Sequence, residues 1–216
     1  GTNTFAGSVV LNGGSLRFGN ASSNLVGAVT VNNGTALSTV NGSVNLMGTL
    51  TLNGSGAATF AGVSSNVTGS VTLNNAAALA FQGPAFNTNG TITLNQTGTL
   101  VYASATTNLM GVVTLNNLGS LTYAAGSTNT VGAVSVKGSG VVNVNGSLHL
   151  GGNNFTVGSA SGDRAVAYFA NNAFLNKLYV GNGASSAGSV IQNGGALTVG
   201  PLASGADVLS IGETGG

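Results

Sequence analysis

Residues 70–132 contain three consecutive units of equal length: SVTLNNAAALAFQGPAFNTNG (70–90), TITLNQTGTLVYASATTNLMG (91–111) and VVTLNNLGSLTYAAGSTNTVG (112–132). Each unit has 21 residues and ends in glycine, and the same spacing continues toward the N-terminus, with closing glycines at Gly27, Gly48 and Gly69. A fixed period of this length is typical of solenoids, in which each repeat packs against its neighbours in sequence.

Each unit contains segments in which apolar and polar residues alternate. The first resembles Val71-Thr72-Leu73, the second ends in an aromatic residue as in Leu121-Thr122-Tyr123, and a third short segment closes the unit, as in 108–111. Turn-forming Asn, Gly, Ser and Ala separate them. Alternation with a period of two indicates β-strands, so we expect two strands in each coil, with the third short segment at its end.

Aligning the units places similar residues in columns. The largest side chains form an aromatic column in which Thr39 and Val144 are substitutes: Phe18, Phe60, Phe81, Tyr102 and Tyr123. A first asparagine column follows the first strand: Asn12, Asn32, Asn53, Asn74, Asn95 and Asn116. A second precedes the closing segment: Asn24, Asn45, Asn66, Asn87, Asn108 and Asn129. We expect hydrogen-bonded amide ladders at the turns; the alternative is a ligand-binding or glycosylated row.

These patterns predict an all-β fold, a parallel β-helix (β-solenoid) with about 21 residues per coil and roughly ten coils. Residues 1–152 form the regular repeats, and the period degrades over 153–216, which we expect to continue the same rod as irregular coils. Within them, 165–180 resembles a helix or a protruding loop. The chain starts within a unit, so we expect a segment of a longer solenoid or ends that stack on a second copy.

Formal charge is almost absent from the chain. Its charged residues are Arg17, Lys137, Asp163, Arg164, Lys177, Asp207 and Glu213. A net charge of +1 does not provide the basic surface that a nucleic-acid partner requires, and it favours association between copies. The chain has no Cys, and no apolar run reaches the roughly 18 residues of a membrane span.

Few residues could perform chemistry. Polysaccharide-cleaving enzymes need clustered carboxylates, whereas we expect Asp163 and Asp207 to lie about two coils apart. Asp163 beside Arg164 predicts a turn with an exposed ion pair. His149 lies in the middle of a strand pattern, so it should point outward, and one His without Cys makes no metal site. We therefore predict a protein that is not an enzyme, with no catalytic, cofactor-binding or metal-binding residues and no cofactor.

The repeats of the form SVTLNN, together with LYVGNGASSAGSVIQNGGALTVG (178–200), resemble the passenger repeats of bacterial autotransporter and filamentous-haemagglutinin-like surface proteins. The resemblance covers nearly the whole chain. It implies a right-handed parallel β-helix, export to the surface or medium of a Gram-negative-type bacterium, and an adhesive or structural role. It carries over no catalytic residue.

The leading functional hypothesis is a non-catalytic extracellular structural protein, a subunit or segment of a self-assembling surface fibre or stalk. Self-association would be end-to-end and also lateral, through an outward column of small residues: Ala36, Ala57, Ala78, Thr99, Ser120 and Val141.

Two other functions are consistent with the sequence. An adhesin module would bind a glycan or a surface protein through residues 153–195, and it predicts exposed aromatic residues among Tyr168, Phe169, Phe174 and Tyr179. An ice-binding protein would use the outward threonine column that contains Thr51, Thr72 and Thr93. Ice binding usually needs two matched columns, and only two coils offer the pattern T-x-T.

Overall fold

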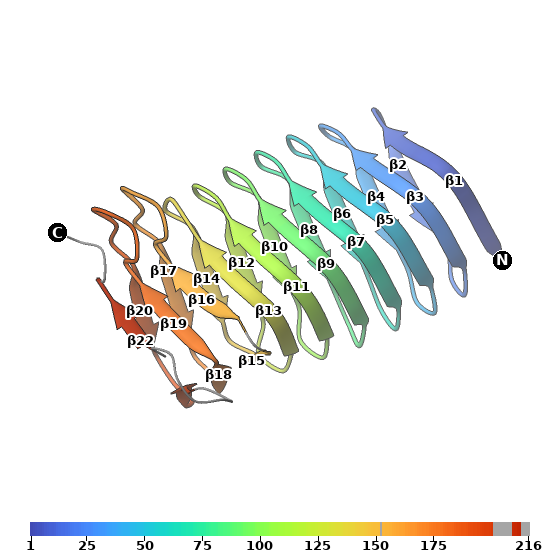
Figure 1. The fold of residues 1–216 in the computed structure, drawn as a ribbon. Helices are drawn as coiled ribbons and strands as arrows, with labels where there is room; N and C mark the ends of the chain where they lie inside the picture. The colour runs from blue at the N-terminus through green and yellow to red at the C-terminus, as the bar shows by residue number, and fades with distance from the viewer. Residues whose placement is uncertain (152, 201–208, 213–216) are drawn as a thin grey trace.

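The computed structural model describes residues 1–151, 153–200 and 209–212, and its regular elements are parallel strands stacked into a rod (Figure 1). The predicted parallel β-solenoid with about 21 residues per turn is confirmed, but the rod has about nine turns rather than ten. The later turns are longer. Val141 pairs with Val166 and Val166 with Ser189, offsets of 25 and 23 residues, whereas Ser120 pairs with Val141 at an offset of 21.

Long strands form one side of each regular coil. They are β1 (Thr2–Leu11), β3 (Ser23–Val31), β5 (Val44–Leu52), β7 (Ser65–Leu73), β9 (Phe86–Leu94), β11 (Thr107–Leu115) and β13 (Thr128–Val136). The third short segment of each unit is not separate from the strand that follows it. The closing segment of one unit and the first strand of the next are one continuous strand, with the closing glycine near its middle. The two segments share one ladder because both keep register with the coils on either side.

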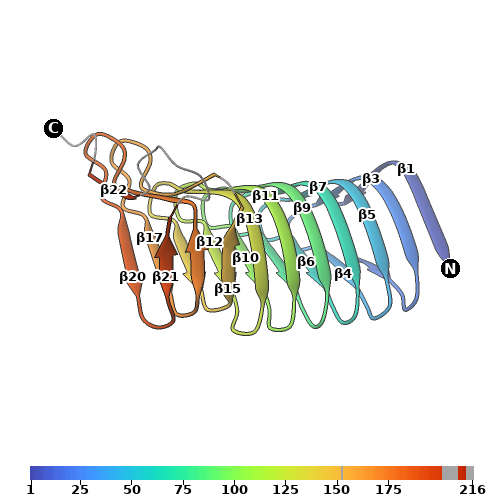
Figure 2. The same ribbon diagram turned by 60° about the horizontal axis from the view of Figure 1, so that its bottom comes forward.

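A second sheet forms the opposite side and contains the strands with the aromatic column. Its order is β2 (Ser15–Phe18), β4 (Ala36–Thr39), β6 (Ala57–Phe60), β8 (Ala78–Phe81), β10 (Thr99–Tyr102), β12 (Ser120–Tyr123), β14 (Val141–Val144), β17 (Val166–Phe169) and β20 (Ser189–Gln192). Figure 2 shows the two sheets from below, joined by turns along the rod.

The first sheet divides after β13. The first half of β13 pairs with β15 (Ser147–Leu150), which leads to β18 (Ala173–Leu175) and β21 (Leu197–Val199). Its second half pairs with β16 (Asn154–Val157), followed by β19 (Lys177–Val180) and β22 (Leu209–Ile211). The helix or protruding loop expected over 165–180 is therefore wrong. Those residues form β17, β18 and β19, because Ala167 and Phe169 face the core with alternation of period two.

The aromatic column lies inside the rod. Phe60, Phe81, Tyr102 and Tyr123 are buried, and successive rings stack with centroids 5.1, 5.0 and 5.6 Å apart. Thr39 replaces an aromatic ring in this column, and its buried hydroxyl has no hydrogen-bond partner. The stack is continuous from β6 to β12 and gives the rod a rigid apolar interior.

The closing glycines are required because neighbouring coils approach each other closely there. A Cβ atom added to Gly69 would lie 2.5 Å from the backbone oxygen of Gly48, and one added to Gly132 would lie 2.8 Å from that of Gly111. Real Cβ atoms do not come this close to an oxygen. The close approach of neighbouring long strands at this position therefore depends on the absence of a side chain.

Replacing Gly69 with Ala should lower the free energy of unfolding by about 2–3 kcal/mol, since the methyl group forces two coils apart. Urea denaturation followed by circular dichroism measures the change. Gly13→Ala is the matched control, because a Cβ at Gly13 meets nothing within 4 Å. Equal stability of the two variants would contradict the close-approach explanation.

Two buried tyrosines make the rod sensitive to alkali. Burial raises the pKa of Tyr102 well above its ordinary value, and the neighbouring Tyr123 raises this pKa further. The hydrogen bond with Asn89 lowers the same pKa by a smaller amount. Burial also raises the pKa of Tyr123. The folded state therefore keeps both phenols neutral at a pH where the unfolded chain loses their protons.

The free energy of unfolding should consequently fall as the pH rises above about 10, the ordinary tyrosine pKa. Each buried phenol should lower it by about 1.4 kcal/mol for each further pH unit. Below that pH, both phenols are neutral in the folded and the unfolded chain, so their full contribution to the stability of the fold is present. Tyr123→Phe should reduce the slope, since Phe occupies the same column at Phe60 and Phe81. Denaturation midpoints between pH 8 and pH 12 test this. An unchanged slope in the variant would show that Tyr123 is not responsible.

Candidate functional site

One asparagine column forms a ladder inside the rod. Each Nδ2 donates to the Oδ1 of the asparagine in the next coil toward the C-terminus, at 2.7–2.8 Å, from Asn3 through Asn24 to Asn129. Its members from Asn24 onward are buried within the long strands and not at turns, which corrects the sequence-based placement. Because the ladder uses their amide groups on one another, these residues are not a ligand-binding row.

Hydroxyl groups complete the inner ladder. In most coils the second Nδ2 hydrogen is donated to a Ser or Thr two residues earlier, such as Ser22, Ser64 and Thr106, at 2.9–3.1 Å. Ala85 occupies this position before Asn87 and offers no acceptor. At the far end, Asn129 donates to the backbone oxygen of Ser147, which closes the ladder where the first sheet divides.

The other asparagine column lies at turns, as predicted, and is half-exposed over most of its length. Its bonds of 2.7–2.9 Å run in the opposite direction. Asn53 donates to Asn32 and Asn74 donates to Asn53, each toward the N-terminus. Water can reach this ladder, whereas the inner one is dry.

Asn66→Leu should lower the free energy of unfolding by about 3 kcal/mol, since it leaves one N–H of the Asn45 amide and the Asn87 side-chain oxygen buried without partners. Asn74→Leu in the outer ladder should cost less than about 1 kcal/mol, because water replaces the lost partner. Urea denaturation of both variants compares them. A similar loss at both positions would contradict the distinction between a dry and a wet ladder.

Asp163 is a structural residue in the described rod. The exposed ion pair predicted with Arg164 is wrong. The carboxylate is buried and accepts hydrogen bonds from the backbone N–H groups of Gly138, Ser159 and Ala160 at 2.6, 2.9 and 2.7 Å. It ties the turn of 159–163 to the preceding coil, because buried backbone amides require acceptors.

The other acidic candidate, Asp207, lies outside the described residues. Across the residues that are described, no group of three or more His, Cys, Asp or Glu side chains could hold a metal ion. In the same part of the chain, no helix is long and apolar enough to cross a membrane.

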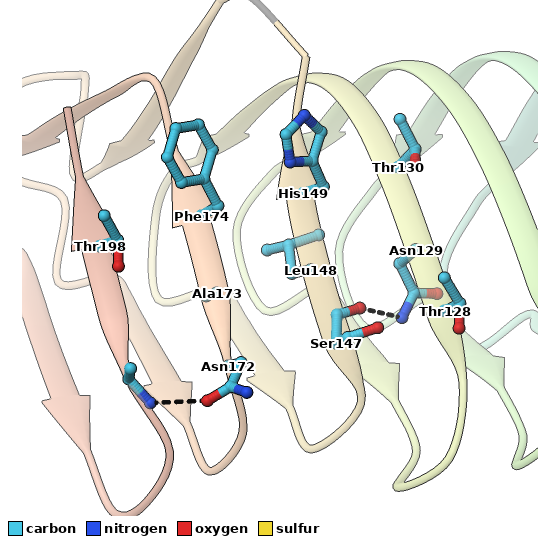
Figure 3. A pocket seen from close by; sticks show the side chains of 11 residues that line it. Thr128, Asn129, Thr130, Ser147, Leu148, His149, Asn172, Ala173, Phe174 and Thr198 are labelled. Atoms are coloured by element: carbon cyan, nitrogen blue, oxygen red, sulfur yellow. Dashed lines mark hydrogen bonds between the residues drawn. The ribbon is translucent and has the colours of Figure 1, made fainter. Parts of the chain in front are cut away.

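A groove lies on the outside of the rod where the first sheet divides (Figure 3). Its volume is about 400 Å³. His149 points outward as predicted, and its ring stacks on that of Phe174 with centroids 5.2 Å apart and planes 11° from parallel. Register places Thr130 and Thr198 on either side of this pair along the rod. The groove is therefore a row of outward side chains from β13, β15, β18 and β21.

Aromatic residues of the irregular coils divide between core and surface. Phe169 is buried, so the expectation of exposure was wrong for it. Tyr168, Phe174 and Tyr179 are partly exposed, because they alternate with buried neighbours along their strands. Of these, Phe174 is the one that lines the groove.

The sequence-based interpretation missed an exposed apolar row on the regular coils, the leucine stripe. Its members point outward from the first halves of the long strands: Leu25, Leu46, Val67 and Leu109, which are 41–53% exposed. Thr88 interrupts the row between Val67 and Leu109. Alternation could have revealed it, because Asn108 and Met110 face inward and Leu109 between them must face outward.

No protein-family model, curated protein or solved structure matches the chain. The comparisons therefore identify neither a family nor an autotransporter or haemagglutinin origin.

Proposed function

We propose that this chain is a non-catalytic structural protein, a subunit or segment of an extracellular fibre or stalk. The observation that carries the proposal is the continuous inner ladder of asparagine amides from Asn3 to Asn129, parallel to the aromatic stack. These side-chain contacts repeat from coil to coil along the regular part of the rod. The rod resists local unfolding because opening one coil breaks side-chain bonds on both sides of it.

The resemblance of the repeats to autotransporter passengers supports export to the surface of a Gram-negative-type bacterium as part of the same proposal. The parallel β-solenoid supports this part of the proposal only through its fold, since a parallel β-helix is the fold that the resemblance implies. A surface with few charges also suits a fibre outside the cell, since its contacts depend little on salt.

Lateral self-association is the second part of the proposal, and the leucine stripe supports it. Leu46 pairs with Leu25 on one side and Val67 on the other, so the apolar side chains are contiguous. Val44 and Phe86 are exposed beside them. No charged residue occurs between Arg17 and Lys137, so two stripes can approach without repulsion.

Electron microscopy of the purified chain over a concentration series tests this function. We expect filaments or bundled rods at high concentration. Leu46→Lys should reduce lateral bundling, because it places like charges in the contact between two stripes. Isolated short rods at every concentration would contradict self-assembly.

Ala57→Lys is the matched control. Ala57 lies on the second sheet, in the column of small residues that the sequence suggested as a lateral face. Bundling retained in this variant and lost in Leu46→Lys would assign the contact to the stripe. The reverse result would assign it to the small-residue column.

A further inference from the structure

The groove beside His149 and Phe174 differs in character from the rest of the rod surface. The leucine stripe carries aliphatic side chains, and in the same outward column the groove carries two stacked rings. Figure 3 shows the rings of His149 and Phe174 next to each other on the same side of their strands. Because the ring planes are nearly parallel and their centroids lie 5.2 Å apart, the two rings stack face to face, and the outer face of each ring is directed along the rod toward Thr130 or Thr198.

Polar groups surround this aromatic surface. The Oδ1 atom of Asn172 accepts the backbone N–H of Ala196 at 2.9 Å, which fixes the side chain so that its Nδ2 group is directed away from that bond. Within the described residues no partner is found for that Nδ2 group or for the hydroxyls of Thr128 and Thr198. The groove therefore offers donors and acceptors within reach of the rings.

The lining carries no formal charge, since it consists of Thr, Asn, Ser, Leu, Ala and Phe with His149 as its single titratable residue. A neutral ligand is favoured over an anion or cation, because nothing in the lining would compensate a desolvated charge. The volume of about 400 Å³ is within the range of small-ligand sites.

We propose that this groove binds a neutral glycan. The C–H groups on one face of a sugar ring would pack against the outer face of His149 or of Phe174, because the faces of aromatic rings carry partial negative charge. Sugar hydroxyls would exchange hydrogen bonds with the Asn172 amide and with the hydroxyls of Thr128 and Thr198. The row from Thr130 to Thr198 crosses four coils, so consecutive sugars of one chain would lie along the rod. This site is independent of the proposed role in a fibre.

Saturation-transfer NMR and calorimetry with the full chain test the proposal. The probes are the neutral disaccharides cellobiose, maltose, lactose and N,N′-diacetylchitobiose, with a galacturonic acid dimer as the charged comparison. We expect at least one neutral sugar to bind with a Kd of about 1 mM, and the charged dimer to bind no more tightly. Phe174→Thr should weaken binding about tenfold, since it removes one of the two aromatic rings and its outer face.

Tyr179→Thr is the control for loss of an aromatic side chain. Tyr179 is half-buried on β19, away from the groove, and its register neighbour is Thr156. This variant should bind the sugar as the unchanged chain does. His149→Thr gives a second test at the groove, and circular dichroism verifies that each variant keeps its fold.

Three results would overturn the proposal. They are the absence of binding by every neutral sugar at about 10 mM, equal binding by the unchanged chain and both groove variants, and tighter binding of the charged dimer. Filament formation in the microscopy experiment is unaffected by any of them, so the two proposals fail separately.

Discussion

Each coil of this rod lies one strand spacing, about 4.8 Å, from the next, so every side chain must contact the same position of its neighbour. Only residues that pack well against their own copies satisfy this constraint over many turns. Asparagine amides do so by donating on one side and accepting on the other, and aromatic rings do so by stacking. The closing glycines meet the same constraint where two backbones come too close for a side chain.

The candidate glycan site arises where this regularity ends. At Asn129 the inner ladder gives its last amide hydrogen to a backbone oxygen, and Leu148, in the next coil, fills the position with an apolar side chain. The strands beyond it are short and belong to longer turns, so their outward positions are freed from the repeated pattern. His149 and Phe174 occupy two such positions. Regular coils thus provide length, and the irregular ones provide a surface with distinct chemistry.

Much of the fold could be predicted from the sequence, because a constant period fixes which residues are neighbours between coils. The aromatic column and both asparagine columns follow directly from alignment of the units. Burial was harder to predict. Asparagine was expected at turns, but Asn108 faces inward and its neighbour Leu109 outward, because the hydrogen-bonded amide is stable inside. Asp163 was misjudged for a related reason, since its partners are backbone amides, which are invisible in the sequence. The groove depends on pairing between strands separated by irregular loops, which no period specifies.

The opposite directions of the two asparagine ladders affect the electrical character of the whole rod. An amide group is a dipole, and a column of aligned amides adds its dipoles along one axis, as peptide groups do in an α-helix. Here Asn45 directs its N–H toward the C-terminal end, whereas Asn53 directs its N–H toward the N-terminal end. The axial moments of the two columns oppose each other. The ladders would therefore give little electrostatic preference between rods that point in the same direction and rods that point in opposite directions in the proposed bundle, where shape and apolar contact would set the orientation.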